Sequence, residues 1–241
     1  MPGGLRNKAE DMAMWAIAQS NPDDAVNLLA NLTNPDRKRS LAKEIALNWS
    51  RIDVHEALDW AGSGQFSDPK LQWEVLSIVL RELAYNDLEL AMQTALNQPL
   101  PSSGDGLESI VIDELVNTDV DKAIEMLSEV RDGRTKILAF TSTAKALVHI
   151  GEFDQAIELH EQLPESRRSN YFSELFGEWT NTDPASLVAM LDELPSEQLK
   201  KNAATQLIIS PPFSPSAKRL SREQAQRVRK ILWPFSEQNG A

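Results

Sequence analysis

The sequence predicts an all-α protein, a right-handed α-solenoid of about six helix-turn-helix repeats followed by a C-terminal capping helix. One residue position recurs every 31 to 34 residues, and a large apolar residue lies eight positions before each occurrence. The recurring residues are Ala25, Ala57, Ala91, Ala123, Ala156 and Leu187, and the preceding ones are Ile17, Trp49, Leu83, Leu115, Val148 and Trp179. A period of this length is typical of stacked two-helix units, none of which buries its apolar faces alone.

Apolar residues inside these units have helical spacing. Leu41, Ile45 and Trp49 fall at i, i+4 and i+8, which places them on one face of a helix. No alternating run of β-branched residues indicates a strand. The same stripe recurs as Trp73, Leu76, Leu80 and Leu83, as Leu107, Val111 and Leu115, and as Tyr171, Leu175 and Trp179. We therefore expect each of these segments to be a helix.

Turn signals separate the expected helices. Asn or Asp precedes Pro at residues 21, 34, 68 and 183, where the polar side chain can cap a helix whose first turn holds the Pro. Residues 98–106 are rich in Pro, Ser and Gly and break the period, so we expect a flexible connector there.

The C-terminal part of the chain is expected to close the array. Residues 1–209 form the predicted helical-repeat array, residues 210–216 a Pro- and Ser-rich linker, and residues 217–241 a basic capping helix and tail. The last helix is expected to begin at Ser221, with Gln224 completing a capping box. Its apolar residues are Leu220, Val228, Ile231 and Leu232. They would cover the apolar side of the last repeat, which would otherwise face water.

The clearest repeat occupies residues 137–164. A first helix is expected from Ile137 to His149, and a Gly-x-Phe-x-x-Ala pattern at residues 151–156 opens the second. The first helix carries its large, small and large residues at Phe140, Ala144 and Leu147. In these features the segment resembles the tetratricopeptide repeat family. The other repeats match only the alanine and one or two apolar positions, and Pro164 comes earlier than the proline of that family. A degenerate array fits these departures, and HEAT-like or other helical repeats remain alternatives.

Composition limits the classes of partner and compartment. The chain has 241 residues, no Cys and a formal net charge of −12. The absence of Cys excludes disulfides and Cys-ligated metal sites. The negative charge opposes binding of nucleic acid to the acidic array and favours basic or mixed protein partners. No apolar run reaches the length of a membrane span. We expect a soluble chain, cytoplasmic as given, or periplasmic or exported if a leader preceding Met1 has been removed.

Catalytic motifs are not evident. The three His residues, His55, His149 and His160, do not have metal-binding spacing, and neither a nucleophile elbow nor a phosphate-binding loop is found. We therefore expect no catalytic residue, metal site or cofactor. Most of the 36 acidic side chains are expected to be solvated, many of them near helix starts. Trp49 and Trp179 lie on the apolar stripe and are expected between repeats, whereas Trp233 is a candidate for an exposed contact.

The C-terminal end is basic. Residues 217–235 carry six Lys and Arg residues against Glu223 alone, a net charge of +5. Such a helix contacts nucleic acid, an anionic membrane or the groove of a target, or it packs on the acidic array. The spacing of its apolar residues favours packing.

The resemblance to the tetratricopeptide repeat implies a binding surface. In that family the fifth, ninth and thirteenth residues of each first helix face the ligand. The corresponding residues here are Thr141, Lys145 and His149, followed in the next repeat by Phe172 and Phe176. An aromatic patch beside a polar one would suit a peptide with an apolar anchor and an adjacent hydrogen-bonding or acidic group. The alternative is that Phe172 and Phe176 pack between helices.

The leading functional hypothesis is a non-enzymatic scaffold or adaptor that binds a protein or peptide on a concave surface. One alternative is an all-α enzyme with a carboxylate pair in a groove. Another is a regulatory module whose basic C-terminal helix contacts nucleic acid or lipid.

Overall fold

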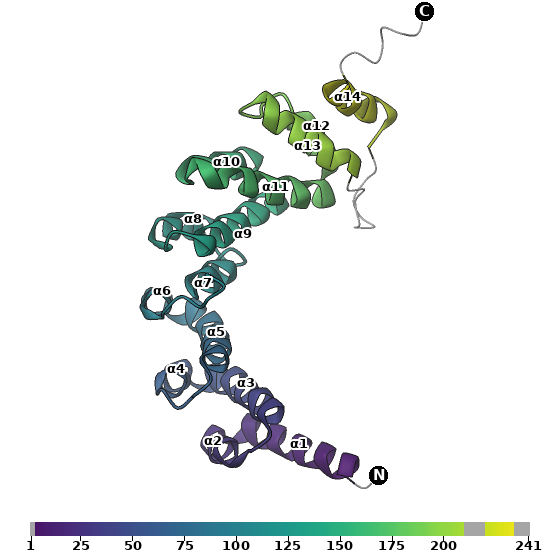
Figure 1. Ribbon diagram of the computed structural model, residues 1–241. Coiled ribbons are helices and arrows are strands. Elements are labelled where there is room, and N and C mark those ends of the chain that lie inside the picture. Colours follow the sequence, from purple (N-terminus) through teal and green to yellow (C-terminus); the bar gives the residue numbers. More distant parts are fainter. Residues whose placement is uncertain (1–2, 210–219, 234–241) are drawn as a thin grey trace, which may run out of the picture. The chain divides into compact units, whose positions relative to one another are not determined.

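The described part of the chain is entirely helical. The computed structural model describes residues 3–209 and 220–233, with side chains from residue 12 onward, and these residues form helices α1 to α14 with no strand (Figure 1). This confirms the all-α prediction. None of the described helices has the length and apolar character needed to cross a bilayer. Two compact units divide the chain, Met1–Leu115 and Val116–Ala241. The predicted array 1–209 extends over both units, and its continuity stays a prediction.

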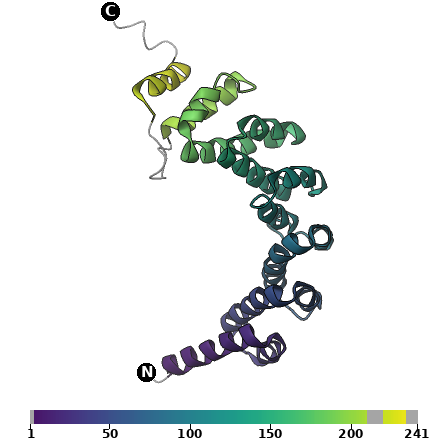
Figure 2. The same cartoon turned by 180° about the vertical axis from the view of Figure 1, so that it is seen from behind.

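The first unit is a row of long helices with shorter helices along one side (Figures 1 and 2). The long row consists of α1 (Gly3–Ser20), α3 (Pro35–Ile52) and α5 (Pro69–Asn86), continued by α7 (Glu108–Leu115). The short helices are α2 (Pro22–Asn31), α4 (Val54–Gly62) and α6 (Leu88–Asn97). Each member of the row contacts the next, and each short helix contacts the two members on either side of it in sequence. The main contacts are thus between sequence neighbours.

The second unit has a related order of contacts. Helix α9 (Arg134–Ile150) contacts α8 (Val120–Met126), α10 (Phe153–Glu158) and α11 (Glu165–Thr182). Helix α11 contacts α12 (Pro184–Met190) and α13 (Glu197–Ile209), and both of these contact α14 (Arg222–Leu232). Short 3-10 helices, Leu127–Glu129 and Leu159–Gln162, follow α8 and α10. The expected capping box of Ser221 and Gln224 is present at the start of α14. The expected linker 210–216 lies outside the described residues.

One acidic residue joins the two helices of a pair. Asp53 ends α3, where its backbone N–H donates to Trp49 O at 2.8 Å, and it begins α4, where its carboxylate accepts from His55 N and Glu56 N. Asp87 and Asp183 do the same at their helix pairs. Each of these caps lies four residues before the recurring small or apolar residue and four residues after the large apolar one. The sequence period therefore marks a turn of fixed geometry, with a cap at its centre.

The recurring alanines allow the helices of a pair to approach closely. Ala25, Ala57, Ala91, Ala123 and Ala156 are all fully buried. The large residues eight positions earlier are buried as well, except Ile17, which is half-buried. A larger side chain at an alanine position has no free volume to enter, because protein interiors are close-packed.

We expect Ala91→Leu to lower the free energy of unfolding of the first unit by about 1–3 kcal/mol, as overpacking of a filled core does. Urea unfolding followed by circular dichroism measures the change. Ala30→Leu in α2 is the matched control, because Ala30 is exposed and Leu has nearly the helix propensity of Ala. Equal stability of the two variants would show that the alanine position is not tightly packed.

Candidate functional site

The polar half of the predicted binding surface lies at the contact between α9 and α11. Lys145 Nζ is 3.5 Å from Glu174 Oε2, and His149 Nε2 is 3.1 Å from Glu178 Oε1. Thr141 is buried, and its hydroxyl has no hydrogen-bond partner among the described residues. Two of the three predicted polar residues are therefore at the surface, but each is already paired with the following helix.

The aromatic half of that surface lies in the core. Phe172 is 1% exposed and Phe176 is fully buried. Their rings stack with centroids 5.4 Å apart, and Phe172 also contacts the rings of Tyr171 and His160. The expected exposed aromatic patch is thus absent from this part of the structure, and packing between helices is what the two side chains do. Helix α11 needs a wide apolar face because it packs against α9, α12 and α13. A binding role for the five residues stays a prediction.

Ion pairs between successive helices of the row recur in the first unit. Arg39 Nε of α3 is 2.9 Å from Glu74 Oε2 of α5, and Arg81 Nη1 of α5 is 2.8 Å from Glu114 Oε2 of α7. The pairs of α9 with α11 have the same arrangement. Partially exposed pairs of this kind contribute little to stability, but they occupy charges that would otherwise meet a ligand. Sequence reasoning missed them because the partners are separated by 29 to 35 residues without a fixed spacing.

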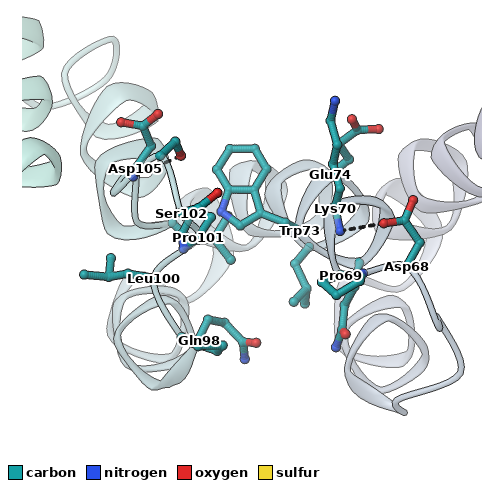
Figure 3. A pocket seen from close by; sticks show the side chains of 15 residues that line it. Asp68, Pro69, Lys70, Trp73, Glu74, Gln98, Leu100, Pro101, Ser102 and Asp105 are labelled. Carbon is teal, nitrogen blue, oxygen red and sulfur yellow. Dashed lines mark hydrogen bonds between the residues drawn. The ribbon is translucent and has the colours of Figure 1, made fainter.

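A groove opens in the first unit between the start of α5 and the loop that follows α6 (Figure 3). Its volume is about 700 Å³. The indole of Trp73 stands between the two walls, with Pro69 on the α5 side and Leu100 and Pro101 on the loop side. The loop wall contains a turn in which Gly104 N donates to Pro101 O at 2.8 Å, and Gly104 has the positive φ of 78° that favours glycine. The segment expected to be a connector thus forms one wall of a groove.

The rim of the groove is mainly acidic. Asp68 and Glu74 lie on the α5 side and Asp105 on the loop side, and Lys70 is the one basic residue among the lining residues described. Glu74 is paired with Arg39 at 2.9 Å and lies 3.9 Å from Lys43. Asp68 caps α5 through one carboxylate oxygen, which accepts from Lys70 N at 3.0 Å. Acidic side chains therefore outnumber basic ones among the lining residues described.

Trp73 itself is half-buried, and its indole N–H is buried with no acceptor among the described residues. Its helical spacing placed it on the apolar stripe of α5, where most of its neighbours are indeed buried. A groove beside it could not be inferred from that spacing, because the opposite wall comes from the irregular loop.

The basic helix α14 packs on α12 and α13 of the second unit. This agrees with the interpretation that the spacing of its apolar residues favoured. Val228 is fully buried, and Arg227 forms an ion pair with Asp192, in the turn that follows α12. Arg227 and Lys200 hold the pKa of the Asp192 carboxyl below its usual value through hydrogen bonds and charge. Trp233, just beyond α14, is 55% exposed. Lys218 and Arg219 of the basic segment lie outside the described residues.

Metal-site geometry is not found in the described part of the chain, where no three His, Asp or Glu side chains gather to hold an ion. Two carboxylates in the groove have structural roles, Asp68 as a helix cap and Glu74 as the ion-pair partner of Arg39. Comparisons of the chain with protein-family models, with curated proteins and with solved structures found no significant match.

Proposed function

We propose that the protein is a non-enzymatic peptide- or protein-binding scaffold, built as a tetratricopeptide-like right-handed solenoid of about six helix pairs. The observation that carries the proposal is the packing of sequence neighbours: within each unit, long helices contact the next long helix, and short helices contact the long ones. In such an array each repeat is stabilised by its neighbours, so the remaining surface residues are available for binding.

The surface chemistry supports a partner of basic or mixed character. Residues 1–115 carry 18 acidic and 9 basic side chains, a net charge of −9. Several basic side chains of the long helices form ion pairs with an acidic side chain of the adjacent helix, as Arg39, Arg81 and Lys145 do. A basic peptide would therefore approach a surface of opposite sign, which raises the rate of association and favours such partners over acidic ones.

A peptide-display selection with the full chain as bait tests the proposal. We expect a family of related sequences to be enriched, rich in Lys or Arg beside apolar residues, and calorimetry to detect their binding as synthetic peptides. An unrelated acidic helical protein of similar net charge is the control bait. Failure to enrich any sequence beyond that control would contradict the proposal.

A further inference from the structure

The size of the groove beside Trp73 suits a short extended segment. Its volume of about 700 Å³ is within the range of sites that enclose a drug-sized ligand. An α-helix with its side chains is about 10–12 Å across, so several helical turns would not enter such a space. An extended chain advances about 3.3 Å per residue, so the groove accommodates a few residues and their side chains.

The apolar lining of the groove has the composition of sites that bind proline-containing segments. Trp73 presents its indole between the walls, and Leu100, which is 43% exposed, flanks it together with Pro101 (Figure 3). Aromatic-lined grooves bind proline-containing chains because these are already extended in solution and lose little entropy on docking. A ligand that covers the exposed apolar surface of Leu100 and Trp73 removes it from water, which favours binding.

The charges of the rim specify the polar part of the ligand. Three of the four charged lining residues are acidic, and the helix cap of Asp68 uses only its Oδ1, so a cationic side chain that follows the α5 wall can pair with the Asp68 carboxylate. Glu74 is less effective because Arg39 already neutralises it. The net charge of −9 on residues 1–115 reinforces this preference at longer range.

We infer that the groove formed by residues 68–76 and 98–107 binds an extended peptide in which proline and a large apolar residue lie beside an Arg or Lys. This inference rests on the proposed peptide-binding function and assigns it a site. The apolar residues cover Trp73 and Leu100, and the cation lies beside Asp68.

The test uses the full chain and synthetic peptides in which two prolines, a leucine and an arginine are placed within seven residues. We expect binding by calorimetry, and weaker binding at high salt because ionic strength screens the carboxylates. Asp68→Asn should weaken binding about fivefold, since Asn caps a helix as well as Asp does but carries no charge. The matched control is Asp53→Asn, which makes the same change at the cap of α4, outside the groove, and should leave affinity unchanged.

A second variant, Trp73→Ala, should weaken binding more than tenfold, as loss of a central aromatic contact does. If Trp73→Ala does not fold by circular dichroism, Leu100→Ser tests the same apolar contact from the exposed loop. Peptides that bind the groove variants as tightly as the wild type would overturn the groove assignment while leaving the proposed function intact. The assignment would also be overturned by equal binding of a peptide with Glu in place of Arg, or by self-association of the chain that Trp73→Ala abolishes. If none of these peptides binds while the display selection enriches other sequences, the groove inference fails and the proposed function stands; if the selection also enriches nothing, both fail.

Discussion

Trp179→Ala is expected to lower the free energy of unfolding of the second unit by about 3–5 kcal/mol, the range for removing a buried aromatic side chain. Trp179 is fully buried, and its ring stacks on Phe153 with centroids 4.6 Å apart. Its indole N–H donates to Ser186 Oγ at 2.7 Å. The variant would lose the buried apolar surface, the ring stacking and the hydrogen bond. It would also leave a cavity where α11 meets the starts of α10 and α12. Urea unfolding measured by circular dichroism reports the change without relying on tryptophan fluorescence.

Trp233→Ala is the control for this prediction, because it makes the same substitution in the same unit at a side chain that is 55% exposed. Exposed substitutions usually change stability by about 0.5 kcal/mol or less. Similar losses in the two variants would mean that Trp179 is not a packing residue between helices.

Phe176→Ala is expected to destabilise the second unit by a similar amount, about 3–5 kcal/mol, because Phe176 is fully buried and stacks on Phe172. This variant separates the two roles that the sequence allows for Phe176, packing between helices and contact with a ligand. Ile150→Ala in α9 is the control, since Ile150 is 59% exposed. A Phe176→Ala protein of unchanged stability that no longer binds peptide would restore the binding role and contradict the burial.

Features with a short sequence range could be predicted. The caps at Asn21, Asn34, Asp68 and Asp183 form as expected, because a cap and the helix it begins are specified within a few residues. The recurring alanines are buried for the same reason, since each is placed by the turn four residues before it. The capping box of Ser221 is equally local.

Features that depend on which helices meet could not be predicted. Phe172 and Phe176 lie on a face of α11 that the tetratricopeptide register assigns to a ligand, and only the packing of α11 against three other helices shows that this face is covered. The groove beside Trp73 depends on the path of an irregular loop, which periodicity does not describe. The ion pairs between long helices depend on long, flexible side chains whose partners sequence spacing does not fix.

The resonances of the tryptophan indole N–H groups test the central claim, peptide binding at the groove, most directly. The chain has six Trp residues, so a two-dimensional nitrogen–proton spectrum should contain six indole signals, and Trp73→Phe identifies that of Trp73. On titration with a peptide that binds, we predict that the Trp73 signal shifts while the signals of buried Trp60 and Trp179 stay in place. A bound peptide that leaves the Trp73 signal unchanged would contradict the account.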